Sequence, residues 1–105
     1  LDEPDRIGRV QRNAAQFIGG LRRAGFDTME SETAIVPVLC GKDEKAYELV
    51  RLCQMENIFV LPVVSPAVPD GMARLRATVT AGHTDGQIKH AVSVLEKAGK
   101  QIGLI

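Results

Sequence analysis

The chain has 105 residues, which is room for one small domain with a modest hydrophobic core. Thirteen basic residues balance thirteen acidic ones, 45% of the chain is hydrophobic, and the mean hydropathy is near zero. This balance argues against a protein that binds nucleic acid or a membrane surface, because both need an excess of positive charge. No apolar run approaches the roughly 20 residues of a membrane-spanning helix, and no segment resembles a signal peptide.

The motif content of the chain is sparse. Cys40 and Cys53 are too few for a disulfide scaffold and form no CxxC motif, so no zinc site is expected and a reducing, cytoplasmic setting is the default. The sequence also lacks a glycine-rich phosphate loop, a GxSxG elbow and an HExxH motif. Its first residue is Leu1 rather than methionine, which indicates processing or excision from a longer protein. Composition and motif spacing by themselves therefore lead only to a soluble domain of mixed helix and strand.

Apolar residues at helical spacing predict an amphipathic helix over residues 5–24. Pro4 stands near its start and Gly25 just past its end, which is the asymmetry typical of helices. Gly19 and Gly20 conflict with the helix, because each glycine in a helix interior costs about 0.8–1 kcal/mol relative to alanine. Since the periodicity continues beyond them, we expect the helix to pack closely against a neighbour at this point.

The segment after this helix predicts a connector, a strand and a second helix. Residues 26–33 are polar and predict a connector, while the apolar run 34–40 predicts a strand covered on both faces. Pro37 cannot donate a hydrogen bond to a neighbouring strand, which indicates an edge position or a local irregularity. Asp43 is the expected N-cap of a helix over residues 44–56.

Five residues of this second helix are expected to face the core: Ala46, Tyr47, Leu49, Val50 and Cys53. Asn57 can adopt a left-handed conformation and is expected to end the helix. Residues 58–61 predict a short strand. The next segment, 62–71, holds three prolines, which excludes a helix or a central strand and predicts a stiff loop ending in an Asp-Gly turn.

The clearest strand covers residues 73–80, where apolar and polar residues alternate. This alternation places Arg74 and Arg76 on the same polar face. Thr84, followed three residues later by a glutamine, fits a capping box at the start of a last helix that ends at Gly99.

The predicted order of elements is therefore α-β-α-β-β-α. The expected fold is an α+β two-layer sandwich, in which helices cover one face of a small, mainly antiparallel sheet of about three strands. Residues 1–105 are expected to form a single domain. His83 is expected to make a local hydrogen bond in the link before the last helix, and His90 to face solvent. Cys53 is expected to be buried and Cys40 to be partly exposed.

Four segments, taken in order, carry a resemblance to a known family. They are Ser-Glu-Thr-Ala-Ile-Val-Pro-Val at 31–38, Asn-Ile-Phe-Val at 57–60, Ser-Pro-Ala-Val-Pro-Asp-Gly-Met-Ala-Arg-Leu-Arg at 65–76 and Thr-Ala-Gly-His-Thr at 80–84. Together they resemble the C-terminal small domain of the α-oxoamine synthases, which are pyridoxal-phosphate (PLP) enzymes of fold type I. This family includes 8-amino-7-oxononanoate synthase, 5-aminolevulinate synthase and serine palmitoyltransferase. The resemblance extends over nearly the whole chain.

The resemblance implies an acyltransferase reaction, in which an amino acid condenses on PLP with an acyl-CoA or another acyl thioester and loses its carboxylate as carbon dioxide. It also implies that Arg76 binds the carboxylate of the amino acid, a role that suits the planar, forked guanidinium. Without the resemblance, a solvent-facing strand arginine would be the preferred interpretation. Ser65 and Ala67 fall in a loop that touches substrate in the family, which often has threonine where Ala67 stands. Serine palmitoyltransferase-like members can have alanine there.

The family's Schiff-base lysine, PLP-stacking histidine and pyridinium aspartate lie upstream of the matching segment. The five lysines of this chain occupy polar helix or turn positions: Lys42, Lys45, Lys89, Lys97 and Lys100. We therefore expect an inactive excised domain with no catalytic residue, PLP or metal of its own, completed by a large PLP-binding domain and homodimeric at full length. Its exposed apolar face is expected along the first helix. The alternative is a standalone, non-catalytic α+β domain that senses a ligand or binds a protein.

Overall fold

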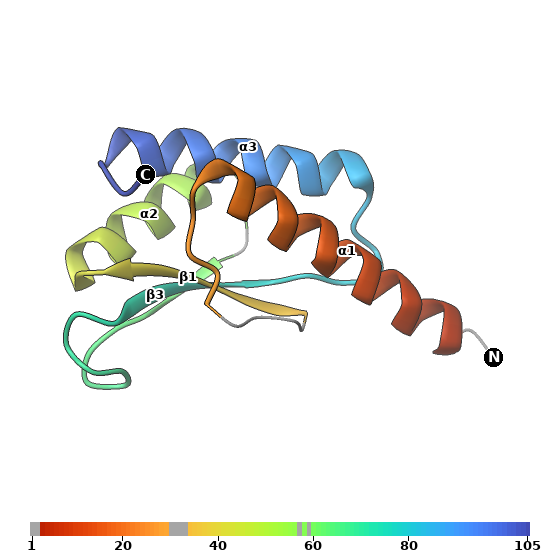
Figure 1. Ribbon diagram of the computed structural model, residues 1–105, viewed down its shortest axis with the longest axis horizontal. Coiled ribbons are helices and arrows are strands. Elements are labelled where there is room, and N and C mark those ends of the chain that lie inside the picture. Colours follow the sequence, from red (N-terminus) through yellow and green to blue (C-terminus); the bar gives the residue numbers. More distant parts are fainter. Residues whose placement is uncertain (1–2, 30–33, 57, 59) are drawn as a thin grey trace.

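In the part of the chain that the structure describes, three helices lie on one face of a three-stranded antiparallel sheet (Figure 1). The structure is a computed structural model and describes residues 3–29, 34–56, 58 and 60–105. The elements are, in order, α1 (Glu3–Ala24), β1 (Ile35–Gly41), α2 (Asp43–Met55), β2 (Val60–Val63), β3 (Ala73–Thr78) and α3 (Asp85–Gln101). The predicted α+β sandwich and its element order are confirmed.

β3 is the central strand, because the sheet has the order β1-β3-β2 with both pairings antiparallel. Along β3 the buried residues alternate with more exposed ones, as predicted. The register places Arg76 between Pro37 on β1 and Leu61 on β2. Pro37 lies on an edge strand, where its missing N–H costs the sheet no interior hydrogen bond.

The core lies between the sheet and the helix layer. Four fully buried leucines come from four different elements: Leu21 on α1, Leu49 on α2, Leu75 on β3 and Leu95 on α3. Burying one such side chain contributes about 1.5–3 kcal/mol. The close helix contact predicted at the glycine pair is confirmed for one of its members, since a Cβ on Gly20 would come within 2.9 Å of Val92 on α3.

The structure corrects several expectations about β1 and α2. β1 is covered on one face only, and Ile35 is 50% exposed, because the helices all pack on the other face. Lys42, not Asp43, is the N-cap residue of α2; Asp43 is its first helical residue and accepts a long hydrogen bond from the Ser65 backbone N–H at 3.5 Å. Tyr47 is 55% exposed rather than in the core, because it lies on the outer side of α2.

The second strand and its neighbours also differ from expectation. β2 begins at Val60 and includes Pro62, which was expected in the loop; as an edge strand it can accept the proline. The expected helix end at Asn57 lies outside the described residues. Cys40 is buried together with Cys53, not partly exposed.

Two glycines with positive φ end the outer helices. Gly25, at φ 111°, follows α1, and the hydrogen bond from Phe26 N–H to the Leu21 carbonyl closes the turn at 3.0 Å. α3 continues past Gly99, its predicted end, and the matching role belongs to Gly103 at φ 77°. Gly99 lies inside the helix, and the position is a glycine because a Cβ there would come within 2.7 Å of the Phe26 ring.

Replacement of this helical glycine by alanine is expected to destabilise the protein. The gain in helix propensity is about 1 kcal/mol, but overpacking a buried ring costs typically about 1–3 kcal/mol, so Gly99→Ala should lower the free energy of unfolding. Gly8→Ala is the matched control: a Cβ added to Gly8 in α1 would meet no atom within 4 Å, so the same change should be neutral or stabilising. Urea denaturation of both variants measures the difference, and equal effects would contradict this account of Gly99.

Candidate functional site

The face of the sheet that the helices leave open carries two arginines on its central strand. Arg76 is exposed, and within the described residues its guanidinium takes part in no hydrogen bond or ion pair. Arg74 is partly buried, and its Nε donates to the Met72 carbonyl at 3.2 Å. The common face predicted for the two side chains is confirmed. Arg76 is the more exposed of the two and, among the described residues, keeps all its N–H donors for a ligand, whereas Arg74 uses its Nε–H on the Met72 carbonyl.

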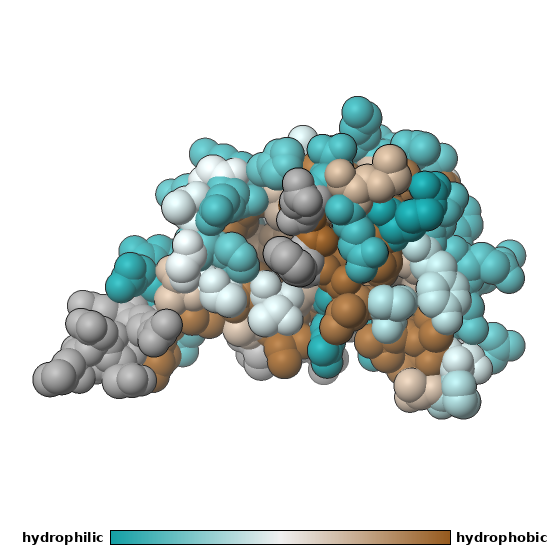
Figure 2. Space-filling view, turned by 180° about the vertical axis from the view of Figure 1, so that it is seen from behind, coloured by the Kyte–Doolittle hydropathy of each residue, from teal (hydrophilic) through white to brown (hydrophobic). Residues whose placement is uncertain are grey.

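Apolar residues surround Arg76 on this open face. Pro37 and Leu61 are its cross-strand neighbours, and Leu61 is 53% exposed. Figure 2 shows hydrophobic atoms along the lower margin of the molecule, on the side away from the helices. Exposed apolar side chains thus lie on the open face of the sheet as well as on the first helix, where they were expected and where Ile7 is 57% exposed. A guanidinium among apolar groups would bind an anion more strongly once the face is covered, because the local dielectric falls.

Ser65 and Ala67 lie in the loop that connects β2 to β3, both with exposed side chains. This loop is a series of short turns: Ala67 N–H donates to the Val64 carbonyl at 3.0 Å, and Gly71 has φ 87° in the predicted Asp-Gly turn. The Ser65–Pro66 peptide bond is cis. Arg76 lies on the same hairpin but near the far end of β3 from this loop, and no hydrogen bond within the described residues joins it to the loop.

The nucleophilic and basic side chains offer little chemistry of their own. Burial raises the pKa of the Cys40 thiol to about 11 and that of Cys53 to about 12, so both are protonated thiols near neutral pH. Of the five lysines, all of which are described, Lys45 donates to the Ile102 carbonyl, Lys100 pairs with Glu96 at 3.3 Å, and the other three are exposed. A Schiff-base lysine needs a desolvated amine, so none of this chain's lysines is suited to form the Schiff base with PLP.

Among the described residues there is no group of side chains that could hold a metal ion, and no helix long and apolar enough to span a membrane.

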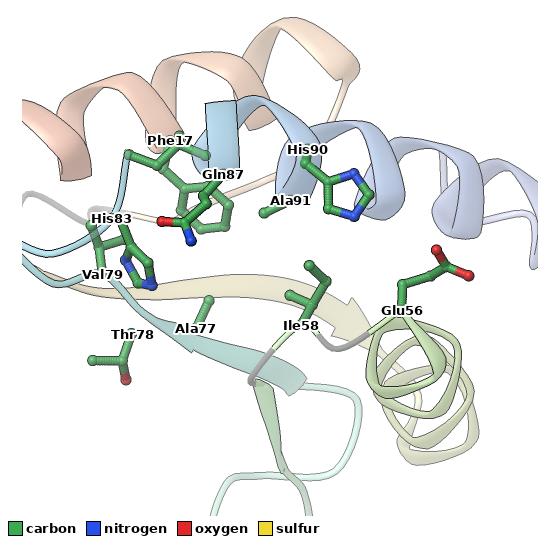
Figure 3. A pocket seen from close by; sticks show the side chains of 11 residues that line it. Phe17, Glu56, Ile58, Ala77, Thr78, Val79, His83, Gln87, His90 and Ala91 are labelled. Carbon is green, nitrogen blue, oxygen red and sulfur yellow. The ribbon is translucent and has the colours of Figure 1, made fainter. Parts of the chain in front are cut away.

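A second feature was missed by sequence reasoning. A hollow of about 470 Å³ lies between α3 and the sheet, beside Glu56 and Ile58, and is lined at one end by His83 and Gln87 (Figure 3). Neither Arg76 nor the loop that follows β2 lines it. The expected local hydrogen bond of His83 is confirmed, since its Nδ1 accepts from Thr80 N–H at 3.0 Å. The sequence signal that could have helped was the capping box, which fixes Gln87 but says nothing of a cavity.

Comparison with known sequences gives a consistent result. The family model described as aminotransferase class I and II matches residues 3–95. An 8-amino-7-oxononanoate synthase/2-amino-3-ketobutyrate coenzyme A ligase from Thermus thermophilus is 42% identical over 103 residues, which are 98% of this chain and 26% of that protein. An 8-amino-7-oxononanoate synthase from Treponema denticola is 36% identical over 105 residues, 100% of this chain and 27% of that protein. The chain thus spans about a quarter of the length of these curated relatives.

Solved structures share the fold at similar coverage. A serine palmitoyltransferase from S. paucimobilis with bound PLP-myriocin aldimine is 31% identical, with a TM-score of 0.85 over 93% of this chain and 25% of that chain. A Sphingomonas wittichii serine palmitoyltransferase is 28% identical, with a TM-score of 0.87 over the same shares. The three-stranded sheet and its helix layer are therefore found as one quarter of larger chains.

Proposed function

Because this chain belongs to the aminotransferase class I and II family, in its α-oxoamine synthase group, we propose that it is the C-terminal small domain of a PLP-dependent acyltransferase. The whole enzyme condenses an amino acid with an acyl-CoA or another acyl thioester and releases the amino acid's carboxylate as carbon dioxide. A large domain holds PLP and supplies the Schiff-base lysine, and the full-length enzyme works as a homodimer. In this assignment residues 1–105 contribute substrate contacts and no cofactor ligand.

The observation that carries the proposal is the exposed guanidinium of Arg76 on the open face of the sheet, which has no partner among the residues that the structure describes. It binds the amino acid's carboxylate by two parallel N–H···O hydrogen bonds, a geometry that lysine cannot reproduce. The strand that carries Arg76 is rigid, because β3 is paired on both sides and the neighbouring Leu75 is fully buried in the core. A residue that positions a substrate needs such a rigid backbone.

The open face is the side on which the large domain completes the site. Leu61 and Ile35 expose about half of their surface there, which is costly for a face that stays in water. Covering it would exclude water from around Arg76 and strengthen its bond to a carboxylate. Ser65 and Ala67, on the exposed loop of the same hairpin, are assigned to substrate contact by the family resemblance alone, since the loop lies at the other end of β3 from Arg76.

The test is an assay of the full-length protein that carries this chain. Carboxyl-labelled amino acids are supplied in a panel with acyl-CoA, and release of labelled carbon dioxide is measured. We expect release to require one amino acid and the acyl-CoA together. Release without acyl-CoA, or none from any pair in a folded protein, would contradict the proposal and favour the standalone, non-catalytic domain.

A control uses the 105-residue chain without further sequence. Mixed with PLP, it should give no Schiff-base absorption band, because its lysines are exposed or occupied by hydrogen bonds and ion pairs. A saturable band would show that the chain holds the cofactor by itself, contrary to the division of roles proposed above.

A further inference from the structure

The hollow between α3 and the sheet has the dimensions of a ligand site. Its volume of about 470 Å³ lies within the range of roughly 300–1,000 Å³ that small-molecule pockets occupy. Most of its wall is apolar, from Phe17 on α1, Ala77 and Val79 on and just after β3, and Ile88 and Ala91 on α3. Figure 3 shows that polar side chains gather at its two ends, with His83 and Gln87 at one end and His90 and Glu56 at the other. An apolar body with one polar head would match this distribution.

The backbone fixes which atoms His83 and Gln87 can present to such a head. The Nδ1 atom of His83 accepts a hydrogen bond from Thr80 N–H at 3.0 Å, so the neutral ring carries its proton on Nε2. The Oε1 atom of Gln87 accepts from Thr84 N–H at 2.9 Å in the capping box, so its NH₂ group is the free end. Each side chain therefore has a free donor to present to a ligand, and its acceptor atom already holds a backbone hydrogen bond.

The position of this pair of donors is fixed by contacts with α1. The buried Asn13 of α1 donates from Nδ2 to the Thr80 carbonyl at 3.0 Å and to the His83 carbonyl at 2.9 Å. These bonds attach the link between β3 and α3 to the helix that also supplies Phe17. The two donors thus stand on a braced segment rather than on a free loop.

From these contacts we infer that the hollow binds a small molecule with an apolar body and a carboxylate head, the head meeting His83 Nε2–H and the Gln87 NH₂ group. A neutral or an anionic acceptor would satisfy two donors. The first turn of α3 lies beside them, where the positive end of the helix dipole favours an anion and the carboxylate of Asp85 in the same turn opposes it, so the preference for the carboxylate rests on the two donors together with the dipole. The chain of the ligand lies along the apolar wall toward Ala91. This site is separate from Arg76, and it does not depend on the acyltransferase assignment.

The test is a titration of the 105-residue chain with octanoate, with octan-1-ol and octylamine as matched probes. Proton–nitrogen NMR spectra follow the side-chain NH₂ of Gln87 and the imidazole of His83. Octanoate is expected to shift both sets of signals saturably at concentrations on the order of millimolar. Octan-1-ol should bind more weakly. Octylamine should leave these signals in place, because its ammonium group has no acceptor for the donors of His83 and Gln87.

The decisive variant is Gln87→Glu. Glutamate also completes a capping box, so helix α3 keeps its start, but the NH₂ donor becomes a carboxylate that repels the ligand head. Octanoate affinity should fall at least about tenfold, while octan-1-ol binding should stay the same. Gln11→Glu, at an exposed position on α1 outside the hollow, carries the same charge change and should leave both affinities unaltered.

Three outcomes would overturn the inference. One is an absence of saturable shifts at His83 and Gln87 with octanoate. Another is equal binding of octanoate and octan-1-ol, which would make the hollow a purely apolar pocket. The third is unchanged octanoate affinity in Gln87→Glu while the helix is still capped, as shown by the backbone amide signal at position 87.

Discussion

Replacement of Arg76 by alanine is expected to abolish most of the affinity of the full-length enzyme for its amino acid substrate. Removing one partner from a desolvated, hydrogen-bonded charge pair costs about 2–5 kcal/mol, which corresponds to a loss of roughly 30-fold or more. Arg76→Lys should recover part of this affinity, because it keeps the charge and loses the fork. Calorimetric titration of the amino acid into each variant measures the change.

Arg74→Ala is the matched control for this prediction. The two arginines share a strand and a face, but Arg74 is partly buried and its Nε donates to the Met72 carbonyl, so we expect it to take no part in substrate binding. Its loss should change amino acid affinity by less than about threefold. Equal effects of the two substitutions, or an unchanged affinity in Arg76→Ala, would remove Arg76 from the substrate site. Neither change should alter stability by more than about 0.5 kcal/mol, as is usual for surface positions.

The residue before Arg76 should behave in the opposite way. Leu75 is fully buried at the centre of the sheet, between the strand pairs and the helix layer. Leu75→Ala leaves a cavity that this small core can only partly fill, and such changes cost about 2–5 kcal/mol. For a domain of this size that is a large share of the total stability of about 5–15 kcal/mol. Urea denaturation of the 105-residue chain gives the free energy of unfolding.

The comparison of neighbouring residues isolates the two faces of β3. Leu75→Ala should shift the unfolding midpoint strongly, while Arg76→Ala should leave it in place, because one side chain faces the core and the other the open face. A cost below about 1 kcal/mol for Leu75→Ala would show that the helix layer does not pack on β3 as described. A comparable cost for Arg76→Ala would show that the guanidinium stabilises the fold rather than serving a ligand.

Much of the fold could be predicted because it depends on patterns of residues that are close together in the sequence. The alternation along β3 indicated the two faces of the central strand, and the capping box indicated the start of α3. Pro37, which lacks the donor an interior strand needs, indicated an edge position or a local irregularity, and β1 is an edge strand. These signals work because each depends on neighbours in sequence.

The incorrect predictions from the sequence have a common cause, because each concerns a position that is decided by contacts between distant segments of the chain. Gly99 resembles a helix end, but it is a packing position that exists because Phe26, far away in the chain, occupies its space. The run before Gly41 was expected to be covered on both faces, since an apolar strand carries no mark of where the helices will pack. Tyr47 was placed in the core on periodicity, although the layer beneath α2 leaves it outside.

The amino-acid sequence by itself determined the element order and the two faces of β3, because residue type and spacing act over a few positions, and the resemblance of four of its segments to a known family indicated the family. Only the tertiary structure decided that Arg76 is exposed between Pro37 and Leu61 on an open face, and that His83 and Gln87 lie together beside a hollow. Exposure and enclosure are properties of how layers come together, and no short stretch of residues encodes them.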